Sequence, residues 1–300
     1  MPILIAPREL AERLDVDARG ALGSDGGARR TVVLDVRWTL AEPDGREAFR
    51  AGHIPSAVYV DLDTELADHG VAGEGRHPLP TQAAFTAAMR RWGLRDDDAI
   101  VVADDAGGMS AARAWWLLRH AGVEDVRILD GALAAWRAAG LPLETGDVEP
   151  DPGDATARFG AMRVVDLDEA DALASAEGGV LLDARAGERY RGEVEPIDPR
   201  AGHIPGAVSA PTADNLGADG RFLPADALRA RFAALGVDAA HPVAAYCGSG
   251  VTAAHEVAAL AIAGIDAALY PGSFSQWSNR PERPVVTGPR PDGGRPPRSS

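Results

Sequence analysis

The chain of 300 residues repeats itself, and this repeat constrains its fold more than any other feature of the sequence. The run Leu34–Arg37 returns as Leu182–Arg185, and the Gly-His-Ile-Pro of residues 52–55 returns at 202–205. Further matched segments follow in the same order in both halves. A repeat of about 130 residues is far longer than the unit of a solenoid, so the sequence predicts two globular domains of similar fold.

The composition of two segments sets the expected domain boundaries. A stretch rich in Pro and Gly predicts a linker at 146–161, and a terminal run of Pro, Gly and Arg predicts a disordered tail at 288–300. The first domain is therefore expected at 1–145 and the second, which contains the only cysteine, at 162–287.

Each half alternates between short β-branched runs and longer helical patterns. The expected strands span residues 31–36, 99–103, 126–129, 180–183, 242–246 and 267–270. The expected helices span residues 82–92, 110–120, 225–235 and 252–263. Such alternation predicts the α/β class, with a mostly parallel sheet flanked by helices in each domain.

Charge and cysteine content exclude several classes of protein. The net charge of −15 argues against partners such as nucleic acid and against an anionic membrane surface, because both require clustered cations. The longest apolar run, Val257–Ala263, is too short to span a bilayer. The first fifteen residues show no secretion signal, and the single cysteine fits a reducing compartment, so a cytoplasmic location is expected.

The single cysteine, Cys247, is expected at the carboxyl end of a strand, just before a helix that begins near Thr252. Ligands bind at this edge of an open parallel sheet. The intervening loop contains Gly248 and Gly250, which permit positive φ and let backbone N–H groups turn toward one centre. Together with the positive end of the helix, these groups predict a cradle that stabilises a thiolate or persulfide on the sulfur.

A lone cysteine is also compatible with a simpler role, since free cysteines commonly act as small buried hydrophobic residues. The repeat argues against this alternative. Matching the strand ends of the two halves places Asp105 where Cys247 stands. The fold therefore does not require a cysteine at this position, and only the second half has a nucleophile.

The tandem halves, the Asp-Ala-Arg at 183–185 and the Cys-Gly-Ser-Gly-Val-Thr at 247–252 resemble the two-domain rhodanese family over residues 1–287. Within it, Gly-Ser after the cysteine is similar to the 3-mercaptopyruvate sulfurtransferases, whereas thiosulfate-preferring members carry Arg-Lys. Gly248 and Ser249 supply no cation for the sulfonate of thiosulfate. The resemblance implies an enzyme, a sulfurtransferase that moves sulfur from 3-mercaptopyruvate through a Cys247 persulfide to cyanide or a thiol acceptor, such as thioredoxin or a small thiol.

The resemblance also implies a proton relay of Ser249, His77 and Asp63 across the interface of the halves. A histidine held by an aspartate can deliver a proton through the serine hydroxyl to the departing enolpyruvate. The residues alone favour a simpler reading, in which His77 caps a loop and Asp63 is surface charge.

Two arginines match the family positions that bind the substrate carboxylate, namely Arg189 and Arg200. Bidentate pairing between guanidinium and carboxylate is a chemical reason for arginine there. Donor-binding roles are also expected for the loop residues Gly248, Gly250, Val251 and Thr252. Asp183 and Arg185 are expected to form a structural ion pair near the loop.

Histidines recur in both halves without the spacing of a metal site. His53 and His203 occupy the repeated Gly-His-Ile-Pro, including the half that lacks a cysteine, so a structural role in the turn is expected. The other histidines are scattered, and we predict no metal and no cofactor.

Three rival functions remain open from the sequence. The first is thiosulfate:cyanide sulfurtransfer on the same scaffold. The second is a cysteine phosphatase, which would need an arginine where Ala253 and Ala254 stand. The third is a non-catalytic sulfur-carrier or redox-sensing module. The physiological donor and acceptor, the pathway and the oligomeric state are not determined by the residues.

Overall fold

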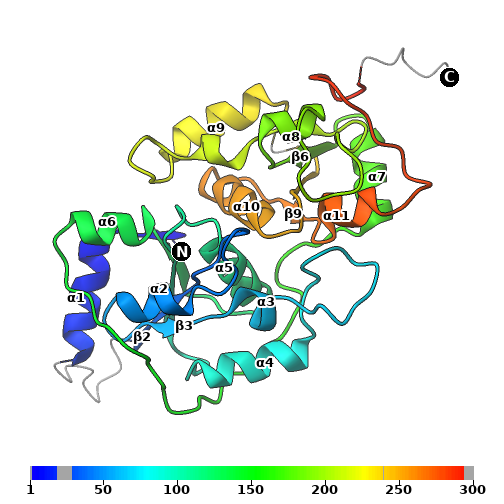
Figure 1. Ribbon diagram of the computed structural model, residues 1–300. Coiled ribbons are helices and arrows are strands. Elements are labelled where there is room, and N and C mark those ends of the chain that lie inside the picture. The colour runs from blue at the N-terminus through cyan, green and yellow to red at the C-terminus, as the bar shows by residue number, and fades with distance from the viewer. Residues whose placement is uncertain (1, 19–28, 239, 294–300) are drawn as a thin grey trace. The chain divides into compact units, whose positions relative to one another are not determined.

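The computed structural model describes residues 2–18, 29–238 and 240–293 and separates the chain into two compact units (Figure 1). The first unit comprises Met1–Asp68, Leu79–Met162 and Gly217–Phe222. The second comprises His69–Pro78, Arg163–Leu216 and Leu223–Ser300. The 69–78 segment therefore belongs to the second unit, although it lies within the first repeat of the sequence.

The first unit contains a parallel sheet of five strands in the order β1-β5-β4-β2-β3. Its strands are β1 (Leu4–Ile5), β2 (Thr31–Asp35), β3 (Val58–Tyr59), β4 (Ala99–Ala103) and β5 (Val126–Leu129). Its helices are α1 (Pro7–Ala18), α2 (Arg46–Ala51), α3 (Leu62–Glu65), α4 (Gln82–Arg91), α5 (Ala111–His120) and α6 (Ala132–Ala138).

The second unit contains a parallel sheet of four strands in the order β7-β6-β8-β9. Its strands are β6 (Val180–Asp183), β7 (Val208–Ser209), β8 (Val243–Tyr246) and β9 (Ala268–Leu269). Its α-helices are α7 (Leu167–Ser175), α8 (Gly187–Arg191), α9 (Ala225–Ala234), α10 (Thr252–Ile262) and α11 (Ser273–Ser278), with a 3-10 helix η1 at Thr212–Asn215.

Burial explains why the central strands are continuous apolar runs. Every residue of β4 and of β8 is buried, as required for strands covered by helices on both faces. A hydrophobic core of the first unit contains Phe49 and Trp136. The core of the second unit contains Phe274 and Trp277. These observations confirm the α/β class and the parallel sheets expected from the sequence.

The two segments expected outside the domains contact the units in specific ways. Within the expected linker at 146–161, the N–H of Gly153 donates to Arg90 O (2.8 Å), inside the first unit. In the expected tail, Pro291 O accepts a hydrogen bond from the N–H of Gly206 (2.8 Å), inside the second unit. Residues 294–300 lie outside the described residues. No helix among the described residues is long and apolar enough to cross a membrane.

Candidate active site

Cys247 directly follows β8 in the loop that leads to α10, as the sequence predicts. Its side chain is buried, and the N–H of Gly250 donates to its Sγ with an N–S distance of 3.1 Å. Gly250 adopts φ 82°, and a Cβ there would lie 2.5 Å from Pro271 O. Only glycine fits this conformation and this space, so the residue is needed to turn its amide toward the sulfur.

The backbone of Cys247 is attached to the turn before α11. Its N–H donates to Ser273 Oγ (3.1 Å), and that hydroxyl donates to Tyr270 O (2.9 Å). The carbonyl of Cys247 accepts from the N–H of Phe274 (3.0 Å). Ser273 itself has φ 54°, a strained value for a residue with a side chain, and its hydroxyl bonds hold this turn against the thiol loop.

The counterpart of Cys247 in the first unit is Asp104, so the prediction of Asp105 is wrong by one residue. The N–H of Leu133 donates to Asp104 O (2.9 Å) just as that of Phe274 donates to Cys247 O. The two aspartates are adjacent, and only the register of β4, which ends at Ala103, shows that Asp104 is the residue in the position of Cys247.

The carboxylate of Asp104 fills the cradle of the first unit. Its Oδ1 accepts from the N–H groups of Ala106 (3.0 Å) and Gly108 (2.8 Å), and its Oδ2 from those of Ser110 (2.9 Å) and Ala111 (3.0 Å). Burial raises the pKa of Asp104, although these four hydrogen bonds lower it. The loop after β4 therefore converges four backbone amides on one acidic group. In the thiol loop, for which the sequence predicted such convergence, the described hydrogen bond to the sulfur comes from the amide of Gly250.

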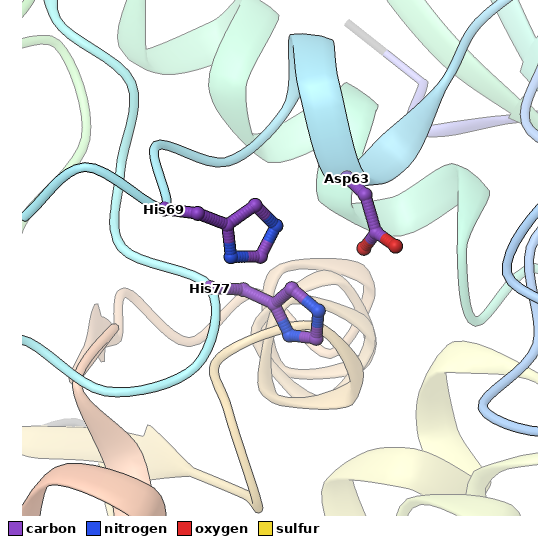
Figure 2. A group of neighbouring side chains, drawn as sticks. All are labelled: Asp63, His69 and His77. Atoms are coloured by element: carbon purple, nitrogen blue, oxygen red, sulfur yellow. The ribbon is translucent and has the colours of Figure 1, made fainter.

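His77 reaches the thiol loop from the 69–78 segment, within the second unit. Its Nδ1 lies 2.8 Å from Ser249 Oγ, and both side chains are buried. Figure 2 shows the neighbouring His69 ring, whose centroid lies 5.6 Å from that of His77. Asp63, also labelled there, lies on α3 of the first unit, where its Oδ1 accepts from Trp38 Nε1 (3.1 Å). Its part in the relay stays a prediction.

Arg189, on α8, lies beside the thiol loop. Its Nη1 is 3.5 Å from the point where a Cβ on Gly248 would stand. Its Nη2 donates to Glu195 Oε1 (2.7 Å) and Asp198 Oδ2 (3.3 Å). Burial would raise the pKa of Glu195, but the N–H of Asp198 and the Arg189 guanidinium together hold it below its ordinary value. Two buried carboxylates thus orient this guanidinium.

Arg200 has a different environment. Its Nε, Nη1 and Nη2 donate to four backbone carbonyls at distances between 2.7 and 2.9 Å. The acceptors are the carbonyls of Trp277, Ser278, Arg280 and Arg283. These bonds use most of the guanidinium donors to hold the turn after α11, and the expected contact of Arg200 with the substrate carboxylate stays a prediction.

The expected ion pair of Asp183 and Arg185 is present beneath the loop. Arg185 Nε and Nη2 donate to the two carboxylate oxygens (3.0 and 2.6 Å), and Nη2 also donates to Gly202 O (2.7 Å). The hydroxyl of Tyr246 donates to Asp183 Oδ2 (2.6 Å), and burial raises the pKa of this tyrosine well above its ordinary value. The residue that precedes Cys247 is therefore locked in place.

The remaining loop residues complete the turn. Val251 is buried, and Thr252 is the first residue of α10. No neighbouring group in the described structure identifies a donor-binding role for either side chain, so that expectation stays a prediction.

Sequence reasoning missed Arg76. Its backbone N–H donates to Ser275 Oγ (3.0 Å), its Nη1 forms an ion pair with Asp198, and its Nη2 lies 2.9 Å from the position of a Gly248 Cβ. It was missed because it lies in the first repeat, whereas its partners lie in the second. Its position next to His77 was the one available signal.

The repeated histidines have the structural role expected for them. His53 Nδ1 lies 3.0 Å from Phe49 O and its ring stacks on Phe49 with centroids 4.0 Å apart. His203 Nδ1 lies 2.8 Å from Tyr190 O and stacks on Tyr190 at 3.7 Å. Both rings are fully buried and brace the chain that follows α2 in the first unit and α8 in the second.

Known proteins share both the sequence pattern and the architecture. Rhodanese-like domains match residues 20–139 and 166–280. The chain is 51% identical over 257 residues to SseB of Mycobacterium tuberculosis, whose name refers to thiosulfate sulfurtransferase activity, with 85% of this chain and 90% of the relative covered. It is 49% identical to a Pseudomonas aeruginosa protein named for 3-mercaptopyruvate sulfurtransferase activity, covering 86% and 92% of the two chains.

A solved structure gives the same picture. The crystal structure of SseA from Escherichia coli, described as a 3-mercaptopyruvate sulfotransferase, superposes with a TM-score of 0.78 at 34% identity. The superposition covers 92% of this chain and all of SseA.

Proposed function

The chain belongs to the rhodanese family of sulfurtransferases, and from this premise we propose that it takes sulfur from 3-mercaptopyruvate as a persulfide on Cys247. The single observation that carries the proposal is the N–H of Gly250 directed at Cys247 Sγ, 3.1 Å away. A backbone donor aimed at the sulfur favours its anionic form, which is the nucleophile. Asp104 supports this reading, because the equivalent loop holds a carboxyl group with four amides.

In the first step, the Cys247 thiolate attacks the sulfur of 3-mercaptopyruvate. A sulfur–sulfur bond forms and the carbon–sulfur bond breaks, so the electron pair of the broken bond remains on carbon as the enolate of pyruvate. The enolate takes up one proton, and the proton of the donor thiol is available from the new persulfide. The products are pyruvate and an anionic Cys247 persulfide, which the same loop amides stabilise.

The proton can reach the enolate through Ser249. Its hydroxyl lies within hydrogen-bond distance of His77 Nδ1, and both groups are shielded from bulk water. A buried imidazole and hydroxyl in contact can pass a proton in one direction and recover it in the other. In this proposal, Asp63 orients His77.

The donor carboxylate is assigned to Arg189. Its guanidinium stands beside Gly248, one residue from the nucleophile, and it is 19% exposed, so an incoming anion can reach it. Glu195 and Asp198 hold the planar group in a fixed orientation, which reduces the entropy lost when a carboxylate pairs with it.

In the second step, an acceptor thiolate attacks the outer sulfur of the persulfide. The sulfur–sulfur bond to Cys247 breaks, the acceptor leaves as a persulfide, and Cys247 returns to the thiolate. With cyanide as acceptor, the same displacement yields thiocyanate. A phosphatase is disfavoured because Ala253 and Ala254 follow the loop where phosphate binding would need an arginine.

Intact mass spectrometry tests the proposal directly. After treatment with 3-mercaptopyruvate, the protein is expected to gain the mass of one sulfur atom, located on the peptide that contains Cys247. Addition of cyanide is expected to remove that mass and release thiocyanate over many cycles. A persulfide that forms but is not turned over would instead support a sulfur carrier, and no added mass would refute the proposal.

A further inference from the structure

Arg76 carries a guanidinium near the thiol loop that neither the repeat nor the family pattern identified. It projects from the 69–78 segment, which α11 holds firmly within the second unit. Gln276 Nε2 donates to Gly73 O (3.2 Å) and to Glu74 Oε2 (2.9 Å). A Cβ on Gly75 would lie 2.5 Å from Gly272 O, so this backbone is packed as closely as glycine allows. The base of the Arg76 side chain is therefore fixed.

The guanidinium of Arg76 lies over the residue that follows the nucleophile. A Cβ on Gly248 would meet Arg76 Nη2 at 2.9 Å and Arg189 Nη1 at 3.5 Å, so the two arginines flank the same point of the loop. Both pair with Asp198, whose side chain is 1% exposed. One buried carboxylate thus holds two cations side by side against Gly248.

Arg76 retains unused donor capacity at this place. Its Nε is buried and has no hydrogen-bond partner among the described residues. The side chain as a whole is 28% exposed, so the guanidinium remains accessible from solvent. A buried donor without a partner is costly unless a ligand or water completes it.

The chemistry of the donor distinguishes what Arg76 can bind. In thiosulfate, the sulfonate is bonded directly to the attacked sulfur, so during attack its oxygens lie next to Cys247 and Gly248. The carboxylate of 3-mercaptopyruvate is separated from its sulfur by a methylene and a ketone. Of the two cations at Gly248, Arg76 stands nearer to this point than Arg189 does (2.9 against 3.5 Å), so Arg76 is the better placed of the two to pair with the sulfonate.

We propose, building on the persulfide function above, that Arg76 is a further donor-binding residue, which pairs with the sulfonate when thiosulfate is the sulfur donor. The 247–252 loop has no cationic side chain of its own, and Arg76 supplies the positive charge from a distant part of the sequence. Thiolate attack on thiosulfate forms the Cys247 persulfide and breaks the sulfur–sulfur bond of the donor. Sulfite leaves with the electron pair, so this reaction needs no proton from Ser249.

This difference in proton demand gives a crossed test in the full-length protein. We expect Arg76→Gln to lower kcat/KM for thiosulfate about 50-fold, mainly through KM, because a charge-assisted contact to the donor is lost. The value for 3-mercaptopyruvate should fall less than about 5-fold. Ser249→Ala should show the reverse pattern, with a loss for 3-mercaptopyruvate and little change for thiosulfate.

Two further variants keep the test decisive. Arg191→Gln removes an exposed guanidinium that pairs only locally with Glu193, and it should leave both donors unaffected. Arg76→Lys keeps the charge without the planar guanidinium, so it should retain part of the thiosulfate activity that Arg76→Gln loses. If Arg76→Gln does not fold, the ratio of kcat/KM for the two donors in Arg76→Lys tests the role of Arg76 instead.

The results that would contradict the role of Arg76 differ from those that would contradict the proposed function. If the wild type forms a persulfide with 3-mercaptopyruvate but does not turn over thiosulfate, the assignment of Arg76 is wrong and the proposed function stands. Equal losses for both donors in folded Arg76→Gln would likewise overturn it. If neither donor adds sulfur to Cys247, the proposed function itself fails.

Discussion

The two units place different acidic groups at the same point of the same fold. In the first unit, Asp104 receives four backbone N–H bonds and is sealed inside the protein. In the second unit, Cys247 occupies this point, and one amide, that of Gly250, points at its sulfur. The same loop thus directs backbone amides at one acidic group in both units, and the identity of one side chain decides whether that group is a carboxyl group or the thiol that we propose carries sulfur.

A second difference concerns what surrounds the cradle. The thiol loop is flanked by Arg76, Arg189 and the Ser249–His77 pair, to which we assign donor binding and proton transfer in the proposals above. In the first unit, the side chain nearest in sequence to the cradle residue, Asp105, faces Arg37 at 3.6 Å. Chemistry therefore depends on the residues around the cradle as well as on the cradle itself.

The largest expected effect comes from replacing the thiol of Cys247 with a group that cannot carry sulfur. Cys247→Ser should lower turnover at least about 1,000-fold, because a hydroxyl cannot carry transferable sulfur. The thermal unfolding midpoint should change little, since the two side chains are close in size. Steady-state assays with cyanide, together with intact mass, provide the measurement. Retained turnover would show that Cys247 is not the sulfur carrier.

The carboxylate of Asp104, which holds the corresponding position in the first unit, can also be removed by substitution. Asp104→Ala should lower the free energy of unfolding by about 4 kcal/mol, because four N–H groups, three of them in buried hydrogen bonds, lose their acceptor. Asp105→Ala is the matched control. Its side chain is 39% exposed, and the change should cost less than about 1 kcal/mol. Denaturant unfolding measures both, and equal losses would contradict the placement of Asp104 in the cradle.

The proposed proton path through Ser249 can be tested by comparing substitution of this serine with substitution of a serine in the first unit. Ser249→Ala should lower kcat for 3-mercaptopyruvate about 100-fold, because the enolate loses its positioned donor. Ser110 lies in the loop of the first cradle, where its hydroxyl donates to Trp38 O (2.9 Å). Ser110→Ala should leave turnover within about 3-fold of wild type, and an equal effect of the two variants would argue against a relay through Ser249.

The smallest expected effect is a pH dependence of stability that originates in the second unit. Burial raises the pKa of Glu256, on α10, from its ordinary 4.5 to about 7, although Arg231 (3.3 Å) and Asn215 (2.6 Å) donate to it. The folded state prefers the protonated form of Glu256. The contribution of this group to the free energy of unfolding is therefore fully present below pH 4.5 and is lost as the pH rises to about 7.

Glu256→Gln stays neutral at every pH, so its stability relative to wild type should rise across this window. The gain should reach on the order of 1–2 kcal/mol and remain constant above it. Thermal unfolding between pH 4 and pH 8 measures the difference. The exposed Glu177→Gln should show a parallel profile to wild type, and a parallel profile for Glu256→Gln would refute the raised pKa.

The central elements were predictable because their signals are local. The buried runs of β4 and β8 are apolar throughout, and the expected bounds of these strands agree with the structure to within one residue. The short edge strands β3 and β7 and the helix α8 were not predicted. Segments of two to five residues carry too little periodicity to stand out from a loop.

The part of the site that one continuous loop forms was predicted from the sequence. The prediction was less complete for the part that distant segments form together. Cys247 and Gly250 were identified from the turn that joins a strand to a helix. Arg200 matched a family position, but its guanidinium holds four carbonyls of the turn after α11. Arg76 was not identified at all, because its neighbours at 198 and 248 are far away in the chain.

The sequence by itself determined the duplication, the parallel α/β class, the place of the single cysteine after a strand and the glycine turn, because each depends on residue types at short spacing. Only the tertiary structure decided that Asp104 is the occupant of the first cradle, because this depends on strand register. Only the tertiary structure placed the 69–78 segment in the second unit and brought Arg76 over Gly248. Such long-range contacts follow from the packing of whole elements, which no local pattern specifies.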